Sequence, residues 1–345
     1  MDPNNPISDF GKMSDEDIQR VIGELKEKGY DHLELNEATL QMAPKVGQMF
    51  LRFVKDTLTH MGLLDKVGIA NPRFGVVLGI DPSTLSPKDI LKAMWNARAH
   101  DWAVVESPMT YAITFQTLME HLKMPTEKKT GRVLKQSFLS LGSGPGLYET
   151  FMAALLHLGG VKDVKIACLD TAKEMTGIHK RILADAYMPT PGSATVTKIK
   201  NVEPVTGDMM SLNFKSGSID QIICNNALQW SLDWKKAVSE MARVINPKGA
   251  GWLYLFFHTH PMSVHNEKGQ TLLQLGGFSI PELFDYLEEK KFLLHHMRQI
   301  KGAMGTGQMG LDINRVFILA RYEEKGIPES WRKRQVSAAL SGMGG

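Results

Sequence analysis

The chain has 345 residues, 43% of them hydrophobic, and its 40 Lys and Arg against 37 Asp and Glu give a formal net charge of +3. This length predicts one large domain or two modest ones, and a charge so near balance argues against nucleic-acid binding. No uncharged apolar run is long enough for a membrane span, and the first residues lack a secretory pattern. We therefore expect a cytoplasmic protein with no nucleic-acid or membrane partner.

The two cysteines, Cys168 and Cys224, lie within apolar runs, which predicts buried thiols in a reducing compartment. Two cysteines cannot supply a four-cysteine zinc site or a three-cysteine iron–sulfur motif. The cysteine count therefore excludes radical chemistry on such a cluster.

Helical patterns dominate the chain before residue 130. A serine N-cap and a final glycine bound residues 14–29, and residues 37–64 place apolar side chains at helical spacing over several turns. Residues 86–99 and 107–124 each begin with Ser-Pro, a favourable pair for the first positions of a helix. We predict a mainly helical N-terminal domain over residues 1–130.

Strands and helices alternate after a basic linker near residues 123–135. Strand patterns lie at 137–141, 164–169, 218–226, 249–257, 292–300 and 313–322, and helix patterns at 147–159, 171–187, 232–245 and 279–291. Residues 188–206 contain at least one further strand, whose ends the pattern does not fix. The alternation predicts an α/β fold with a largely parallel sheet covered on both faces, and the last two strands predict an antiparallel pair. We assign residues 131–325 to this domain and 326–345 to a C-terminal tail.

The segment FLSLGSGPGLYETF places Gly142, Gly144 and Gly146 between the first strand of this domain and its first helix. Glycine lets the backbone approach a ligand closely and adopt positive φ, and the following helix offers free N–H groups. The turn is therefore the expected ligand crevice of the sheet. The third glycine comes one residue too early for the G-x-G-x-x-G dinucleotide motif, which disfavours NAD.

Polar residues follow the ends of the next strands. Asp170 ends the second strand, where a carboxylate can accept both hydroxyls of a ribose. Asp208 follows a later strand and could accept from an adenine amino group, and Asn225 and Asn226 end the strand after it. Each has a structural alternative, since Asp170 could cap the next helix and the others could form turns or caps. Their recurrence at successive strand ends predicts one shared ligand site.

These residues belong to segments that resemble the class I S-adenosylmethionine-dependent methyltransferases. The matching segments follow the family's order over about residues 133–322 and read "LSLGSGPG", "CLDTAKEM", "VTGDMMSLNFKSGSIDQIICNNALQW" and "EMARVINPKGAGWLYL". The resemblance implies a seven-stranded Rossmann-like sheet whose last strand is antiparallel to its neighbours. It also implies S-adenosyl-L-methionine as the cofactor and S-adenosyl-L-homocysteine as the product.

The resemblance further implies which residues bind the cofactor. They are Gly142, Ser143, Gly144 and Gly146 in the glycine turn that flanks the methionine portion, Asp170, Thr171 and Met175 at the ribose, Asp208 and Met209 at the adenine, and Asn225 along the pocket. The family often has an acid two residues before the first glycine, where this chain has Ser140. Backbone carbonyls or another acid would then hold the amino group of the cofactor. Glu149 is a poor substitute, because it lies a turn into the helix.

The sequence indicates the residues that would bind the methyl acceptor less clearly. The segment "NNALQW" lacks the Asn/Asp-Pro-Pro-aromatic signature of many adenine and glutamine N-methyltransferases. It faintly resembles carboxylate methyltransferases of the malonyl-carrier-protein and aconitate type, which would place Gln229 and Trp230 beside the acceptor. Packing at the start of a helix is the alternative for both residues.

Three histidines, His258, His260 and His265, follow the fifth strand. An imidazole titrates near neutrality, so His258 is the candidate general base and His260 a candidate substrate-binding residue; structural hydrogen bonds are the alternative. No metal site is expected, because no acidic or cysteine ligand completes a set. Tyr148 opens the first helix beside the glycines and either contacts the substrate, as a second catalytic candidate, or packs.

Residues 61–69 and 83–91 loosely resemble the winged-helix region of small-molecule O- and S-methyltransferases, which implies an N-terminal dimerisation and lid domain and a homodimer. The leading hypothesis is methyl transfer to an O or S atom of a small metabolite, such as an organic acid. The alternatives are a methyltransferase acting on a macromolecule, such as a protein or a carrier-bound acyl group, a cofactor-binding protein without turnover, and an NAD-linked oxidoreductase.

Overall fold

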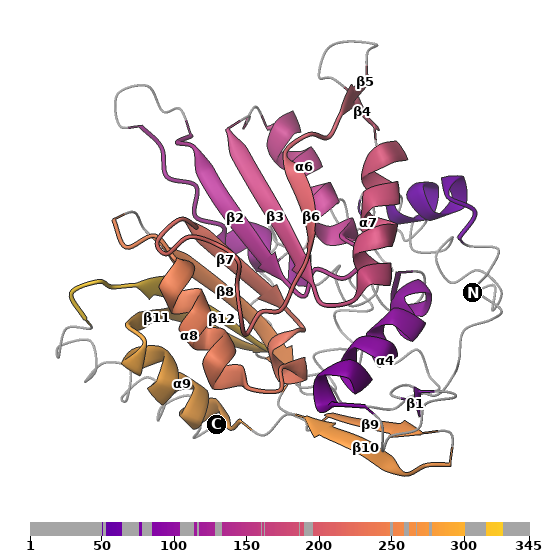
Figure 1. Ribbon diagram of the computed structural model, residues 1–345. Helices are drawn as coiled ribbons and strands as arrows, with labels where there is room; N and C mark the ends of the chain where they lie inside the picture. The colour runs from indigo at the N-terminus through magenta and orange to yellow at the C-terminus, as the bar shows by residue number, and fades with distance from the viewer. Residues whose placement is uncertain are drawn as a thin grey trace, which may run out of the picture.

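A seven-stranded sheet with helices on both faces forms the centre of the molecule (Figure 1). The computed structural model describes residues 50, 53–63, 76–77, 85–103, 114–115, 117–127, 133–159, 161, 163–185, 187–189, 196–248, 251–258, 262–266, 268–275, 278–300 and 315–326. The strand order in this sheet is β11-β12-β8-β7-β2-β3-β6. The strands are β2 (Gln136–Leu141), β3 (Val164–Asp170), β6 (Val202–Thr206), β7 (Gln221–Asn225), β8 (Trp252–His258), β11 (Phe292–Ile300) and β12 (Arg315–Tyr322).

The direction of the strands confirms the predicted Rossmann-like sheet. Strands β6, β3, β2, β7 and β8 pair in parallel, whereas β12 lies between β8 and β11 and is antiparallel to both. The chain builds outward from β2 through β3 to β6, then crosses back to place β7 and β8 on the other side of β2. The order therefore reverses at β2, and a crevice is expected at the carboxyl end of that strand.

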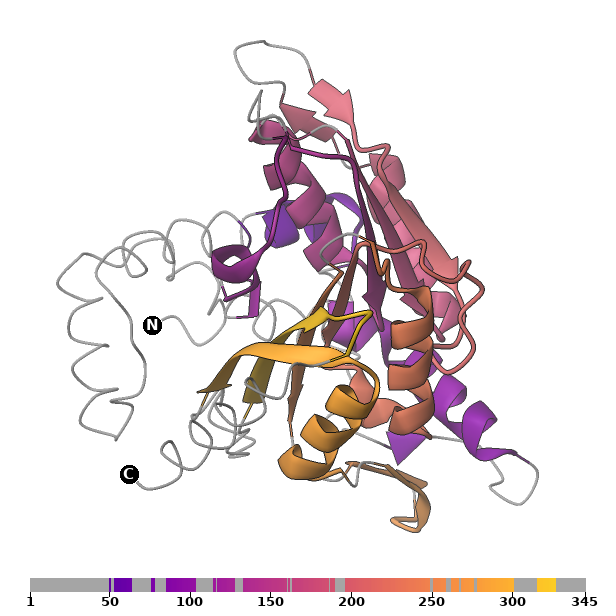
Figure 2. The same cartoon turned by 90° about the vertical axis from the view of Figure 1, so that its left-hand side faces the viewer.

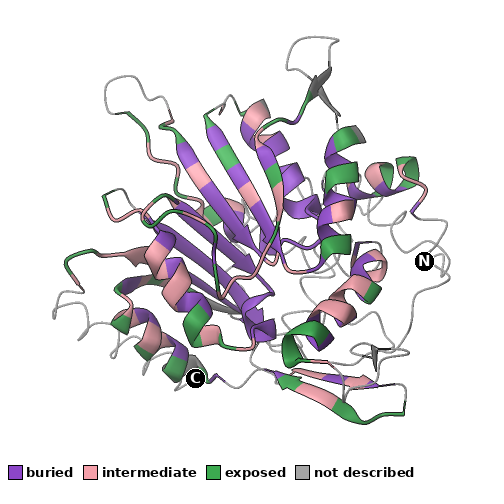
Figure 3. Ribbon diagram, in the orientation of Figure 1, coloured by how far each residue is buried: buried purple, intermediate pink, exposed green. Residues whose placement is uncertain are grey.

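Helices α6 (Leu147–Leu158) and α7 (Lys173–Asp185) lie on one face of the sheet, and α8 (Trp234–Val244) and α9 (Ile280–Glu289) lie on the other (Figure 1). The central strand β7 is buried along its whole length, as Figure 3 shows. Period-2 alternation divides the side chains of β8 between the two faces. Tyr254 and Phe256 pack on the α6 side, and Leu253 and Leu255 pack on the α8 side.

Side-chain caps fix where several helices begin. Ser86 is the N-cap of α4 (Pro87–Asp101), and its Oγ accepts from the Asp89 backbone N–H at 3.3 Å. Asp233 caps α8 in the same way from the Lys236 N–H at 2.9 Å. The Ser-Pro start predicted at residue 86 is confirmed.

Helix α4 packs beside a second, three-stranded sheet of β1 (Val76–Val77), β9 (Met262–Asn266) and β10 (Thr271–Leu275) (Figures 1 and 2). Ile90 and Met94 of α4 share an apolar cluster with Val264, Leu275 and Trp230. The sequence pattern did not predict the β9–β10 hairpin. Residues 188–206, where at least one strand was expected, hold β6, β5 (Val196–Lys198) and most of β4 (Tyr187–Pro189), and β4 and β5 pair with each other.

The predicted N-terminal helices are only partly within the described residues. The helix at 14–29 lies outside them, whereas residues 53–60 are helical and place Val54 and Leu58 in the core beneath α6. Residues 117–121 are helical too, as the pattern over 107–124 predicts. The domain boundaries stay a prediction. None of the helices in the described part combines the length and apolarity needed to cross a membrane.

Candidate functional site

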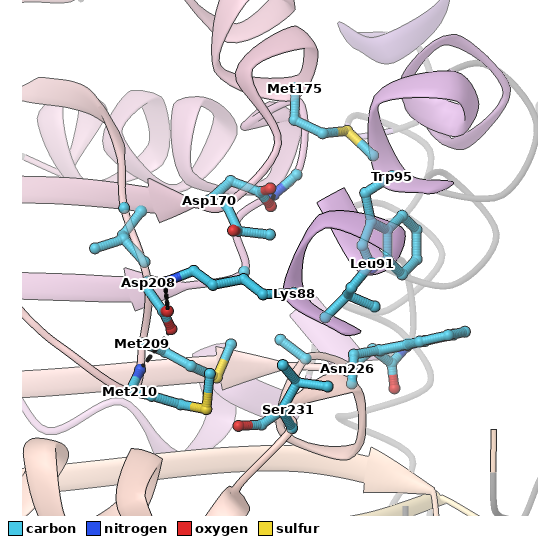
Figure 4. A pocket seen from close by; sticks show the side chains of 18 of the residues that line it. Lys88, Leu91, Trp95, Asp170, Met175, Asp208, Met209, Met210, Asn226 and Ser231 are labelled. Carbon is cyan, nitrogen blue, oxygen red and sulfur yellow. Dashed lines mark hydrogen bonds and ion pairs between the residues drawn. The ribbon is translucent and has the colours of Figure 1, made fainter. Parts of the chain in front are cut away.

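A pocket lies at the carboxyl ends of β2, β3 and β7, at the point where the strand order reverses. It encloses about 740 Å³ of space not filled by atoms, part of it open to solvent. All of the predicted cofactor residues except Ser143 and Gly146 line it. Figure 4 shows Asp170 and Asp208 on one side of this space and Leu91, Trp95 and Asn226 on the other.

The three glycines of the turn all have left-handed backbone, with φ of 64° at Gly142, 57° at Gly144 and 70° at Gly146. A Cβ on Gly142 would lie 2.3 Å from the Ala227 Cβ, so only glycine lets the turn pass this close to the segment after β7. Gly142 and Gly144 line the pocket.

Gly146, which was predicted to bind the cofactor, does not line the pocket. It is the N-cap of α6, and a Cβ there would lie 2.1 Å from the His179 ring. The His179 side chain is fully buried, and its Nε2 is 3.2 Å from the Thr150 hydroxyl. Burial lowers the pKa of His179 to about 3, so the ring packs as a neutral group between α6 and α7. Gly146 therefore serves the packing of these helices.

Asp170 joins the glycine turn to the end of β3. Its Oδ2 accepts from the Gly144 N–H and its Oδ1 from the Ala172 N–H, both at 2.8 Å. The side chain lines the pocket although the residue is only 8% exposed. Burial raises the pKa of Asp170 to about 6, against the lowering effect of these N–H donors. The Ala172 N–H precedes α7 (Lys173–Asp185), so the Oδ1 contact closes a turn before the helix and is not a helix cap, while the side chain lines the pocket.

Ser140 and Glu149 form a buried pair between β2 and α6, and neither residue is among those that line the pocket. The Ser140 Oγ donates to the Glu149 Oε1 at 2.6 Å, so α6 returns a carboxylate to the end of β2. The turn before α6 brings the first turn of that helix beside Ser140, and the statement that Glu149 is a poor substitute for the family's acid stays a prediction. Glu149 is 2% exposed, and its Oε2 has no hydrogen-bond partner in the described part. Burial is the largest cause that raises its pKa to about 7, with a smaller contribution from the Asp170 charge.

Changing Glu149 to Gln is expected to alter how stability depends on pH. The folded pKa of about 7 lies above the ordinary value of 4.5, so Glu149 favours folding at low pH and loses that contribution as pH rises through about 7. The difference in the free energy of unfolding between Glu149→Gln and the parent protein should therefore shift by roughly 3 kcal/mol in favour of the variant as pH rises from 4.5 to 7.5. Urea unfolding without cofactor at several pH values measures this shift. Glu174→Gln, at an exposed position, is the control. A difference between Glu149→Gln and the parent that does not vary with pH would contradict the raised pKa of Glu149.

Asp208 holds the far wall of the pocket. Its Oδ1 accepts from the Met210 N–H at 2.9 Å, and its Oδ2 is 2.6 Å from the Lys88 Nζ. Lys88 lies at the start of α4, and its side chain reaches across the pocket toward Asp208 (Figure 4). This half-exposed ion pair contributes little stability, but it joins the covering helix to the sheet.

The end of β7 supplies uncharged polar groups. The Asn225 Nδ2 donates to the Thr114 Oγ1 at 3.1 Å, and Asn226 follows with a left-handed φ of 54°. The Oδ1 atoms of both residues are buried without a hydrogen-bond partner in the described residues. Of the two predicted acceptor residues, Trp230 lines the pocket, whereas Gln229 is 1% exposed and does not line it.

Of the two catalytic candidates, only Tyr148 has a side chain within the described residues. Tyr148 is 1% exposed and packs edge-on against Phe115, with its hydroxyl 3.4 Å from the Thr114 carbonyl oxygen; it does not line the pocket, so the packing alternative describes it. The His258 backbone ends β8, but its side chain and the whole of His260 lie outside the described residues. His265 lies in β9 with its Nε2 2.7 Å from the Ser263 hydroxyl.

Sequence reasoning missed the contribution of α4. Lys88, Leu91, Trp95 and Trp102 all line the pocket. The spacing of three, four and seven residues repeats along one helical face, and two tryptophans on that face could have marked it. Nothing in the spacing says which part of the sheet that face covers.

The described residues gather no group of three or more His, Cys, Asp or Glu side chains that could hold a metal ion.

Comparison with known proteins gives one family match, for residues 139–253, to a model described as a methyltransferase domain. No curated protein matches. A SAM-dependent methyltransferase from Methanosarcina mazei is 18% identical with a TM-score of 0.43, over 55% of this chain and 94% of that one. A SAM-dependent methyltransferase from Aquifex aeolicus is 12% identical with a TM-score of 0.43, over 69% and 99%. The 1,6-didemethyltoxoflavin-N1-methyltransferase of Burkholderia thailandensis, solved with S-adenosylhomocysteine, is 14% identical with a TM-score of 0.46, over 71% and 94%. Likenesses this distant say nothing about the acceptor.

Proposed function

We propose that the chain is an S-adenosylmethionine-dependent methyltransferase that methylates an oxygen or sulfur atom of a small metabolite. The match of residues 139–253 to a methyltransferase domain model supports the transfer of a methyl group. The observation that carries the proposal is the covered pocket, in which α4 lies over the carboxyl ends of the strands. A pocket that a helix partly covers suits a small acceptor better than a macromolecular one.

The residues present fit the cofactor. Asn225 Oδ1 and Asn226 Oδ1 belong to residues that line the pocket, and they are buried polar atoms without a partner in the described part. Such atoms suit a ligand that brings hydrogen-bond donors and positive charge. We propose that the glycine turn binds the methionine portion, Asp170 the ribose hydroxyls and Asp208 the adenine amino group.

The protein's own contribution to the chemistry is positioning and exclusion of water. S-adenosylmethionine, when bound, supplies an electrophilic methyl group on a sulfonium. Leu91 and Trp95 close the pocket from α4, and Asn225 and Asn226 orient the acceptor from β7. Holding the acceptor atom in line with the methyl carbon and keeping water away account for much of the acceleration in such displacements.

An acceptor hydroxyl or thiol must also lose a proton. The described residues that line the pocket include no histidine, cysteine or tyrosine. A general base at His258 therefore stays a prediction, tested by turnover of His258→Ala over a range of pH.

A homodimer formed through residues 1–130 is also part of the proposal, and it rests on the loose resemblance of that region to the winged-helix region of small-molecule methyltransferases. Action on a macromolecule and cofactor binding without turnover are the alternatives.

The first experiment is calorimetric titration with S-adenosylmethionine, S-adenosylhomocysteine and NAD. We expect low-micromolar binding of the first two and none of NAD. Transfer of a labelled methyl group into fractionated metabolites then tests the acceptor class. Label found only in protein or carrier fractions would favour the macromolecular alternative, and tight cofactor binding without transfer to any fraction would favour a non-catalytic protein.

A further inference from the structure

We propose that the acceptor end of the pocket is a tryptophan-lined subsite for a flat, uncharged aromatic molecule that carries a hydroxyl or thiol. This inference rests on the proposed function and names the substrate class of the same site. It is carried by three indole rings, by unpartnered polar atoms beside them and by the distribution of charge.

The three indoles belong to Trp95, Trp102 and Trp230, and all three line the pocket. The centroid of the Trp95 ring lies 5.5 Å from that of Trp102 and 4.9 Å from that of Trp230, with interplanar angles of 84° and 79°. Rings at near right angles form a corner and not a continuous stack. A flat ring placed in such a corner can lie face-on against one indole and edge-on against the next, the two favourable aromatic geometries.

Polar atoms without partners lie along the same wall. Asn226 Oδ1 and Ser231 Oγ are buried, line the pocket and have no hydrogen-bond partner in the part of the chain that the structure describes. A buried polar atom left unpaired costs free energy, which a ligand that brings a donor would recover. Asn226 also holds a left-handed φ of 54°, a conformation that is concentrated at functional sites.

The charged groups lie on the opposite side. The charged side chains among the described lining residues are Lys88, Asp170 and Asp208, and the Lys88 Nζ is engaged 2.6 Å from Asp208. Figure 4 shows both aspartates across the cavity from Trp95 and Asn226. Among the described lining residues, Lys88 is the one cation, and its Nζ is paired with Asp208, so a carboxylate beside the indoles would find no other cation there, which is costly. The charges therefore favour a neutral ring over the organic acid considered from the sequence.

The expected step is balanced without a further reactant. The acceptor oxygen or sulfur forms a bond to the methyl carbon as the sulfur–methyl bond breaks, and the electron pair of that bond returns to the sulfur of the departing thioether. The proton of the hydroxyl or thiol passes to a base, for which His258 is the predicted candidate, and from that base to water outside the pocket. An aromatic hydroxyl ionises with a pKa of about 10, as in tyrosine, which makes this loss easier than for an aliphatic alcohol.

The test uses the full chain saturated with S-adenosylhomocysteine and three probes titrated by calorimetry. They are 2-naphthol, its saturated counterpart 2-decalol, and 2-naphthoate. We expect 2-naphthol to bind with one-to-one stoichiometry and at least ten times more tightly than either of the others. If 2-decalol binds as tightly as 2-naphthol, the ligand need not be aromatic and the proposal is overturned. If 2-naphthoate binds more tightly than 2-naphthol, the site favours an acid and not an uncharged ring.

Substitutions of tryptophan test whether 2-naphthol binds at the indole rings of the pocket. Trp95→Leu should weaken 2-naphthol at least tenfold, Trp95→Phe should restore most of the loss, and Trp234→Leu should change nothing. Trp234 is the matched control because it packs on Phe278 and Tyr286, away from the pocket. Unchanged 2-naphthol affinity in Trp95→Leu would overturn the proposal. If S-adenosylhomocysteine itself fails to bind, the proposed function fails with it; if it binds and 2-naphthol does not, only the substrate class fails.

Discussion

Replacing Gly142 by alanine is expected to abolish cofactor binding and to lower the free energy of unfolding by at least about 3 kcal/mol. The new Cβ would lie 2.3 Å from the Ala227 Cβ, well inside van der Waals contact. Ala227 is itself buried beneath the pocket, so neither backbone segment can yield without moving the turn or the end of β7. Calorimetric titration with S-adenosylhomocysteine and urea unfolding measure the two effects.

Gly62 provides a control that separates the clash from backbone strain. Its φ of 63° nearly equals the 64° of Gly142, but nothing lies within 4 Å of a Cβ built there. Gly62→Ala should therefore cost only the roughly 1–2 kcal/mol of left-handed backbone and leave cofactor binding intact. If Gly142→Ala and Gly62→Ala lose the same stability and both bind, the close approach to Ala227 has no function.

Asp170→Ala is expected to weaken cofactor binding by roughly a hundredfold, or about 2.7 kcal/mol. Two losses combine. The carboxylate no longer faces the cavity to accept the ribose hydroxyls, and the Gly144 N–H loses the Oδ2 acceptor that lies 2.8 Å away. Since hydrogen bonds to charged groups are the stronger ones, the effect should exceed that of removing a neutral partner.

The amide variant divides these losses. Asp170→Asn keeps the size of the side chain and one oxygen, so it should retain part of the affinity while losing the charge. Exposed Asp285→Ala on α9 controls for net charge and should bind as the parent does. Affinity for S-adenosylhomocysteine is measured for all three variants, and unchanged binding in Asp170→Ala would remove Asp170 from the cofactor site.

The sequence by itself determined the sheet and one wall of the site. Apolar strands alternating with amphipathic helices specify a parallel sheet, because each element must bury its own apolar face. The glycine turn, Asp170 and Asp208 lie at strand ends, and the carboxyl ends of parallel strands meet at one edge. Position along the chain is therefore enough to bring these residues together, and eight of the ten predicted cofactor residues line the pocket, all but Ser143 and Gly146.

Only the tertiary structure decided the rest of the site. The link from Ser140 to Glu149 depends on the path of the turn between β2 and α6, which three left-handed glycines set and no periodicity reveals. Lys88 and Trp95 reach the pocket only because α4 packs where it does. Its position is set by apolar contacts with β10 and Trp230, which are far from α4 in the sequence. A helical pattern identifies an apolar face, but the surface that covers it is chosen by packing between distant segments. For that reason the residues at the strand ends followed from local sequence, whereas the residues that α4 brings to the pocket did not.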